Sequence, residues 1–200
     1  MSLVQFDGPA GRLEGLYDEV EAGTAEKCVV LCHPHPLYGG SMHDAVLDAL
    51  SKAFRSRSVA VLRFNFRGVG GSAGVHDDGK GEADDLMAAA EWIRQQSGAR
   101  ELILGGYSFG AAMAIKAVAA MACDQLVLVA PPVALIEGLS PPAQPACVIL
   151  GSEDQFVDAA AARGFFGEAT GLHMIEGADH FFFGAHDTIT ELTGAALDGV

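Results

Sequence analysis

Short apolar runs alternate along this chain with segments whose apolar residues recur at helical spacing, and this alternation constrains the fold most. The runs have the length of β-strands, and most lack polar alternation, as strands buried on both faces of a parallel sheet require. They are residues 28–32 (CVVLC), 59–66 (VAVLRFNF), 102–105 (LILG), 126–130 (LVLVA), 146–150 (ACVIL) and 172–175 (LHMI). The pattern predicts an α/β fold: a mostly parallel central sheet flanked by helices on both faces.

The intervening segments predict the helices. Apolar residues fall on one face of residues 46–54 and again of residues 86–93. Residues 109–121 (FGAAMAIKAVAAM) are almost all small or apolar, so we expect this helix to lie buried and close to the sheet. A last helix is expected over about residues 187–197. The first 20 residues contain a Gly-Pro turn and predict an antiparallel hairpin at the sheet edge.

Composition narrows the class of protein. A chain of 200 residues, 50% of them hydrophobic, suits one core, so we expect a single domain over residues 1–200. Its 12 Lys and Arg against 26 Asp and Glu give a net charge of −14, which argues against nucleic acid and anionic membranes as partners. We see neither a secretory signal nor an apolar stretch near the roughly 18 residues of a membrane span.

The four cysteines carry a second indication of location. They lie in or beside apolar runs and form no CxxC pair, so neither a zinc site nor a redox motif is indicated: Cys28, Cys32, Cys123 and Cys147. Buried, reduced thiols are the expectation, and a cytoplasmic location fits them best.

Ser108 is the first candidate catalytic residue. It stands between Gly106 and Gly110 in a GxSxG pattern, directly after an apolar strand and directly before the buried helix. A sharp strand-to-helix turn strains the serine backbone, and bulky neighbours would collide with the adjoining strand and helix, which accounts for the glycines. The context favours a nucleophile over a structural serine in a glycine-rich turn.

A serine hydroxyl needs a base to take its proton, and the base needs a third group to orient it. Asp154 and His180 both lie in turns that follow predicted strands, at the sheet edge where Ser108 also emerges. Asp154 has the alternative reading of a helix N-cap, and Glu153 or Asp158 remain open as the acid. The competing bases are weaker: His173 lies within a strand and His186 lies past the turn.

An oxyanion hole needs preorganised amide donors. Phe109, directly after the candidate nucleophile, supplies the first. The second is expected from the loop HPHPLYGGSMHD (residues 33–44), where two prolines remove amides and leave Leu37 or Tyr38, of which we favour Leu37. A substrate pocket is expected from the apolar side chains near this edge: Tyr38, Val133, Phe156 and Phe181.

Two further patterns resemble ligand sites. His33 and His35 stand one residue apart, a spacing that suits a pair of metal ligands, but a convincing third ligand is missing, so histidines that shape the loop are the better interpretation. The glycine-rich FNFRGVGGSAG (residues 64–74) does not match GxGxxG, so a tight loop rather than a dinucleotide cradle is expected. We predict neither a metal nor a cofactor.

Together these motifs resemble the α/β-hydrolase superfamily over nearly the whole chain. The HPHPLYGG and FRGVG loops, GYSFG, the aspartate of GSEDQF and the histidine of GADHFF are similar to those of small bacterial hydrolases, distantly similar to dienelactone hydrolases. The resemblance implies a hydrolase fold, a triad of Ser108, Asp154 and His180, and no cofactor. Dienelactone hydrolases proper use cysteine where this chain has Ser108, so their substrate does not carry over.

Members of the superfamily with a lid insert many residues after the strand that corresponds to residues 126–130. Only 14 residues, 131–144, are available here, so we expect a minimal cap domain or none. Without a lid, soluble esters with short acyl or alkyl groups are expected to be preferred over long-chain lipids.

The leading functional hypothesis is hydrolysis of small carboxylic esters or thioesters through an acyl-serine intermediate. A peptidase or amidase, or an acyltransferase, would use the same three residues. A binding protein that retained the fold without catalysis is the alternative from another class. The sequence does not identify the natural substrate or the oligomeric state.

Overall fold

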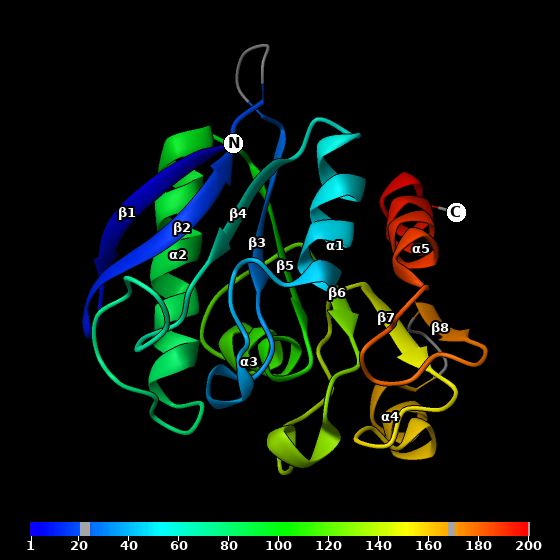
Figure 1. Ribbon diagram of the computed structural model, residues 1–200. Helices are drawn as coiled ribbons and strands as arrows, with labels where there is room; N and C mark the ends of the chain where they lie inside the picture. The colour runs from blue at the N-terminus through cyan, green and yellow to red at the C-terminus, as the bar shows by residue number, and fades with distance from the viewer. Residues whose placement is uncertain (21–24, 168–170, 200) are drawn as a thin grey trace.

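A computed structural model of the chain describes residues 1–20, 25–167 and 171–199. Its strands are β1 (Ser2–Gly8), β2 (Gly11–Asp18), β3 (Lys27–Cys32), β4 (Ala60–Phe64), β5 (Glu101–Tyr107), β6 (Gln125–Val129), β7 (Ala146–Gly151) and β8 (Gly171–Ile175). They form one sheet of order β1-β2-β4-β3-β5-β6-β7-β8 (Figure 1). β1 pairs with β2 and β2 with β4 in antiparallel fashion, and the remaining neighbours are parallel. The predicted α/β fold and edge hairpin are confirmed.

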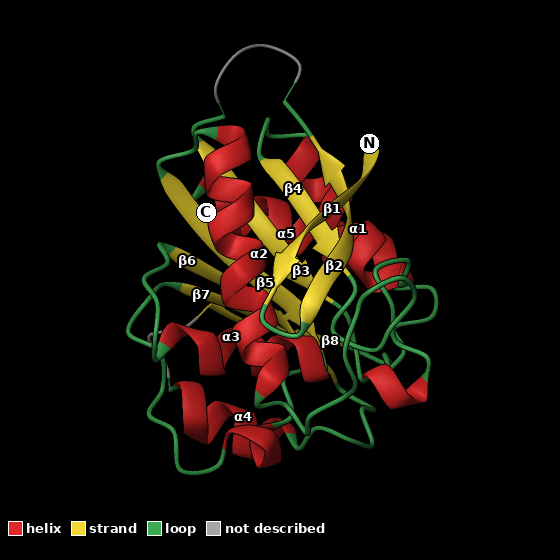
Figure 2. Cartoon of the chain, turned by 90° about the vertical axis from the view of Figure 1, so that its left-hand side faces the viewer, coloured by secondary structure: helices red, strands yellow, loops and turns green. Residues whose placement is uncertain are grey.

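Helices cover both faces of the sheet. They are α1 (Ala45–Arg55), α2 (Gly81–Ser97), α3 (Phe109–Val118), α4 (Ala159–Phe166) and α5 (His186–Asp198), with two 3-10 turns, η1 (Pro36–Tyr38) and η2 (Val133–Ile136). α1 packs against α5 on one face, and α2 packs against α3 on the other (Figure 2). The core lies between these layers, where β3 from Cys28 to Cys32 is fully buried.

α3 confirms the expected link between small side chains and close packing. Alanine and glycine at half of its positions allow the helix to approach the sheet, and nearly all of it is buried. It ends at Val118 rather than Met121, because Ala119 and Ala120 continue as a turn bonded to the last helical carbonyls.

Two other features differ from the sequence prediction: the end of β4, and an additional helix. β4 ends at Phe64 rather than Phe66, because the Phe66 amide leaves the sheet to bond the ring of His33 (3.1 Å). α4 was not predicted. It is a short helix with Asp158 as its N-cap and Gly167 as its C-cap, so its caps rather than an apolar stripe define it.

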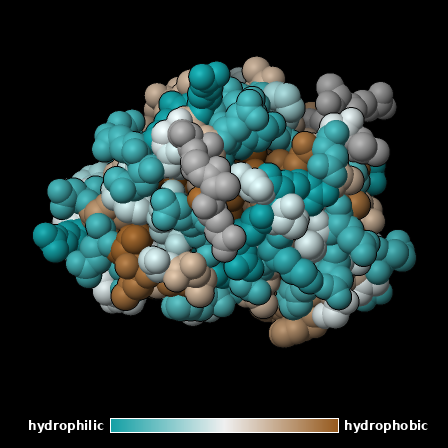
Figure 3. Space-filling model, turned by 90° about the horizontal axis from the view of Figure 1, so that it is seen from above, coloured by the Kyte–Doolittle hydropathy of each residue, from teal (hydrophilic) through white to brown (hydrophobic). Residues whose placement is uncertain are grey.

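The parallel strands β3 to β8 all end at one edge of the sheet, here called the carboxyl edge, which lies at the bottom of Figure 1 together with η2 and α4. Residues 131–144, where a lid would be inserted, contain only η2. Seen from the opposite edge, the surface is mainly hydrophilic with small apolar spots (Figure 3). Within the described ranges, no helix has both the length and the apolar character needed to span a membrane.

Candidate active site

Ser108 occupies a strained turn between β5 and α3. Its φ of 53° and ψ of −118° lie in a region that residues with a side chain rarely adopt. The surroundings hold it there: the Ser108 amide donates to the Val129 carbonyl of β6 (2.8 Å), and the Ser108 carbonyl accepts the Ala112 amide (3.1 Å). The turn therefore presents the hydroxyl at the carboxyl edge on a rigid backbone.

The flanking glycines are required by close backbone contacts. A Cβ at Gly110 would stand 2.1 Å from the Cys32 carbonyl oxygen at the end of β3. A Cβ at Gly106 would stand 2.5 Å from the carbonyl carbon of Gly110. The GxSxG spacing thus lets the serine turn press directly against the strand that leads into the 33–44 loop.

The structure brings Ser108, His180 and Asp154 into one hydrogen-bonded line. His180 Nε2 lies 3.0 Å from Ser108 Oγ, and His180 Nδ1 lies 2.7 Å from Asp154 Oδ2. Because an ionised carboxylate only accepts, Nδ1 carries the proton and Nε2 is free to accept one from the serine. This is the arrangement in which a histidine acts as general base toward a hydroxyl.

Asp154 is itself fixed by backbone donors. Its Oδ1 accepts the amides of Phe156 (2.8 Å) and Val157 (2.9 Å), and its side chain is 1% exposed. Asp158, one of the alternative acids, instead caps α4 by accepting the Ala160 amide (2.8 Å). Glu153 is exposed on the same loop. Of the acids considered, Asp154 is the one bonded to His180.

The histidine loop, residues 176–185, is held from two further sides. The Tyr107 hydroxyl donates to the His180 backbone carbonyl (2.7 Å), and the two rings lie 5.4 Å apart. A Cβ at Gly151, at the end of β7, would stand 2.3 Å from the Ala178 carbonyl oxygen, so the acid and histidine loops touch through their main chains. The sequence prediction missed Tyr107, although its place directly before Ser108 in GYSFG marks it as close to the site.

The predicted oxyanion donors lie on two elements. Phe109 is the first residue of α3, and the first amides of a helix have no acceptor within that helix. The Leu37 amide donates to His35 Nδ1 at 3.3 Å, while Tyr38 and Gly40 donate to the His35 carbonyl. Burial next to His76 lowers the pKa of His35, so its ring is neutral and able to accept this bond. The long Leu37 bond is weak and easily exchanged.

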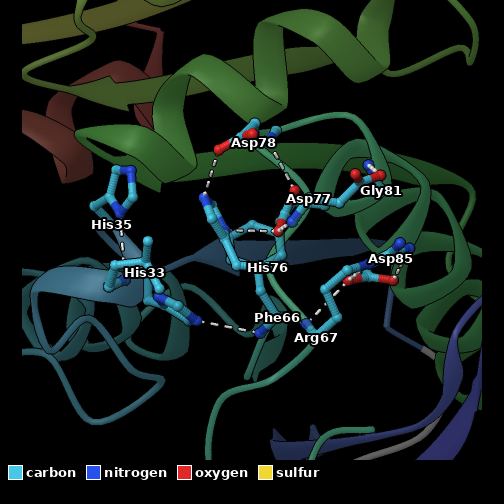
Figure 4. Close-up of polar contacts among 12 residues, drawn as sticks. His33, His35, Phe66, Arg67, His76, Asp77, Asp78, Gly81 and Asp85 are labelled. Atoms are coloured by element: carbon cyan, nitrogen blue, oxygen red, sulfur yellow. Dashed lines mark hydrogen bonds and ion pairs between the residues drawn. The ribbon is translucent and has the colours of Figure 1, made fainter. Parts of the chain in front are cut away.

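His33 ties this loop to the next one (Figure 4). Its Nδ1 bonds the Pro34 carbonyl (2.6 Å), and its Nε2 accepts the Phe66 amide (3.1 Å). Complete burial lowers the pKa of His33 to about 4, so the ring is neutral at neutral pH. Both ring nitrogens are engaged, as expected of a histidine that shapes the loop.

Buried charges hold the loop of residues 65–80, which follows β4 (Figure 4). Arg67 makes a two-point contact with Asp85 of α2, at 2.9 Å from Nε and 2.7 Å from Nη2, and Asp85 is fully buried. Glu82, also fully buried, accepts the amides of Asp77 and Gly79, and its Oε1 lies 2.8 Å from Nδ1 of His76. The predicted tight loop is therefore built around buried carboxylates.

A cavity of about 440 Å³ lies beside this site. It is lined by Val133, Ala134, Ile136, Glu137, Gly138, Leu139, Phe156, Asp158, Ala161 and Phe165. Two predicted pocket residues, Val133 and Phe156, are among them. Tyr38 lies outside its walls and packs on His35 (4.7 Å between rings), and Phe181 lies outside them beside His180 (5.9 Å).

Comparisons with known proteins identify the family. A family model described as "Serine aminopeptidase, S33" matches residues 23–146. An uncharacterized protein of Rickettsia prowazekii (strain Madrid E) is 35% identical over 197 residues, which span 91% of this chain and 82% of that protein.

Solved structures match over the whole fold. An alpha-beta serine hydrolase homologue from Coxiella burnetii has a TM-score of 0.91 at 33% identity, covering 98% of this chain and 97% of its own. A serine hydrolase without a lid from Xanthomonas campestris has a TM-score of 0.86 at 37% identity, covering 100% of this chain and 93% of its own. The chain therefore belongs to the serine aminopeptidase S33 family, as a lidless member of the α/β-hydrolase superfamily.

Proposed function

We propose that this hydrolase cleaves small carboxylic esters or thioesters through an acyl-serine intermediate. The observation that carries the proposal is the line from Asp154 through His180 to Ser108, at 2.7 and 3.0 Å. Four free, buried cysteines support a cytoplasmic location for this activity.

The reaction follows from the hydrogen-bond directions. Ser108 Oγ attacks the substrate carbonyl carbon as His180 Nε2 takes its proton, and Asp154 stabilises the resulting imidazolium. The Phe109 amide, with Leu37 as second donor, binds the oxyanion, and the positive end of α3 adds to this stabilisation. The leaving alcohol or thiol takes the proton from His180, and the acyl group stays on Ser108.

Deacylation repeats these steps with water. His180 accepts a proton from the attacking water and returns it to Ser108 as the acid product leaves, so the enzyme is regenerated without any other reactant. Residues 131–144 insert no lid over the edge, so the acyl-serine is expected to be open to water, which supports hydrolysis over transfer to another alcohol.

Labelling with a fluorophosphonate probe tests for an activated serine before any substrate is known. Wild type and Ser140→Ala, a control at an exposed serine, are expected to label, and Ser108→Ala is not. Ser108→Ala is also expected to lose turnover of 4-nitrophenyl acetate by a factor on the order of 10⁶. A folded wild type that fails to label favours a binding protein on the same fold. A Ser108→Ala variant above about 1% of the wild-type rate contradicts the nucleophile.

The family description favours one second candidate, an aminopeptidase. Cleaving an amide uses the same three residues but requires His180 to protonate an amine as it leaves. Assaying aminoacyl 4-nitroanilides beside the acetate ester, with Ser108→Ala as the blank, separates the two. A higher kcat/KM for the anilides replaces the ester proposal with the peptidase.

A further inference from the structure

The cavity between η2 and α4 adjoins the site on two sides. η2 follows β6, whose Val129 carbonyl accepts the Ser108 amide (2.8 Å), and it packs against α3, the helix that Ser108 precedes. Phe156 connects the cavity to the histidine, because it lines the cavity while its ring lies 5.0 Å from that of His180. The cavity is therefore joined to the triad through Phe156, and we take it as the space for a group attached to the carbonyl that Ser108 attacks.

The size of the cavity limits what fits it. Its volume of about 440 Å³ is near the lower end for small-molecule pockets. It equals the liquid volume of about 15 water molecules, and since a methylene group takes nearly the volume of a water molecule, a chain of about fifteen carbons is the upper limit. Most of the lining residues are exposed, so the cavity is open to solvent, and a bound group is expected to fill only part of it, with about six to ten carbons. Most of its lining is apolar, with aromatic rings from Phe156 and Phe165.

The charge of the cavity limits it further. Glu137 and Asp158 are the charged residues that line it, and both are acidic. Asp158 is fixed there because its Oδ1 accepts the first amides of α4, those of Ala160 and Ala161. A ligand carboxylate in the cavity would face two like charges, and among the described residues no cation lines the cavity to offset them, within a chain of net charge −14.

We propose that this cavity binds an uncharged acyl or aryl group of about six to ten carbons and rejects groups that carry a carboxylate. The proposal rests on the proposed function and gives it a substrate class: neutral esters of medium length. It extends the expected acyl group from a few carbons to the capacity of the cavity, and long-chain lipids still exceed that capacity.

An acyl series of 4-nitrophenyl esters from two to sixteen carbons measures the fit. Each methylene up to the optimum is expected to raise kcat/KM about fourfold, and the optimum is expected at six to ten carbons. Ala161→Trp fills the cavity from α4 and is expected to move the optimum to two to four carbons. Ala160→Trp, the exposed neighbour outside the cavity, is the matched control and keeps the wild-type profile.

The proposed rejection of carboxylates is tested with a matched pair of esters. Wild type is expected to hydrolyse the hexanoate at least about tenfold faster than the six-carbon ester that ends in a carboxylate. Glu137→Gln is expected to reduce the rate ratio between the two esters severalfold, whereas Glu191→Gln, at an exposed residue of α5, leaves the ratio unchanged. An equal ratio in the Glu137 variant and wild type contradicts the proposed rejection of carboxylates.

A binding measurement separates the cavity from the chemistry. Calorimetry on Ser108→Ala is expected to show octan-2-one bound, octanoate bound at least about tenfold more weakly, and octan-2-one lost in the double variant with Ala161→Trp. Equal binding of octan-2-one with and without Ala161→Trp overturns the cavity proposal. Binding as expected, together with a wild type that fails to label or to cleave esters, overturns the proposed function alone.

Discussion

The two halves of the carboxyl edge are built differently. In the first half, the loops of residues 33–44 and 65–80 enclose buried polar groups. His33 accepts the Phe66 amide, and Arg67 pairs with Asp85 of α2. Glu82, also on α2, accepts the Gly79 amide of the second loop. In the second half, the segments after β6 and β7 line a mainly apolar cavity, and the loops after β7 and β8 expose Phe156, Phe181 and Phe183. The first half carries the proposed loop donor to the oxyanion, and the second carries the acid, the base and the proposed substrate cavity.

This difference separates the residues that stabilise the fold from those that act in the proposed reaction. A buried polar group in the first half has exchanged its hydrogen bonds to water for a hydrogen bond or ion pair within the protein. Losing that partner therefore lowers the free energy of unfolding. In the second half, Asp154 and His180 are buried but belong to the proposed proton relay, and the exposed aromatic rings face solvent, so replacing these side chains is expected to change turnover or selectivity. Substitutions in the two halves are therefore expected to produce opposite signatures.

The largest effect is expected in the second half. Asp154→Asn removes the charge that stabilises the His180 imidazolium and alters its favoured tautomer, so kcat is expected to fall by about 10³ to 10⁴. The unfolding midpoint in urea is expected to stay near that of wild type, because the asparagine still accepts the loop amides. Glu153→Gln and Asp158→Asn are the matched controls. If one of them is the damaging change and Asp154→Asn is mild, the acid is assigned wrongly.

The next largest effect tests the first half. Asp85→Asn leaves the buried Arg67 guanidinium without its counter-charge, and this is expected to lower the free energy of unfolding by about 3 to 5 kcal/mol. Asp84→Asn, an exposed neighbour on the same helix, is expected to stay within about 0.5 kcal/mol of wild type. Urea unfolding at neutral pH measures both. Comparable stability of the two variants removes the contrast between the halves.

A smaller effect is expected from pH. Since the pKa of His33 is about 4 when folded and near 6.5 when unfolded, the unfolded chain binds the extra proton between these values. Its contribution to stability is full above about pH 6.5 and is lost as the pH falls, by about 2 kcal/mol from pH 7 to pH 5.

The variant His33→Asn isolates this contribution, because it cannot titrate in that range. The stability difference between pH 7 and pH 5 is expected to be about 2 kcal/mol smaller than in wild type. His43→Asn, at an exposed histidine, is expected to keep the wild-type difference. Identical pH slopes for His33→Asn and wild type show that the His33 ring is not held neutral by the fold.

The sequence predicted the line of Ser108, Asp154 and His180 because each signal is local. A nucleophile turn has its glycines at fixed spacing, and the acid and histidine directly follow apolar strands. The parallel sheet then gathers these strand ends at one edge without further information. Val133 and Phe156, two of the four residues expected in a substrate pocket, line the cavity, and their role in binding substrate stays a prediction.

Other parts of the site left no such signal. The Arg67–Asp85 pair and the bond from the Phe66 amide to His33 join residues 18 and 33 positions apart, through contacts that no spacing rule encodes. α4 is eight residues long and is defined by its caps, so its apolar period is too short to recognise. The cavity depends on where α4 and η2 lie in space, and therefore could not be predicted either.

The glycines at both ends of the triad affect how such a site can evolve. Gly110 rests on the Cys32 carbonyl, and Gly151 rests on the Ala178 carbonyl. At both places main chain touches main chain, so the distance from the serine turn to the end of β3, and the distance from the acid loop to the histidine loop, are set by the thickness of the polypeptide rather than by any side chain. The exposed side chains around the site can then be substituted while the reacting atoms keep their alignment. The substrate can change in this way without a change in the catalytic residues.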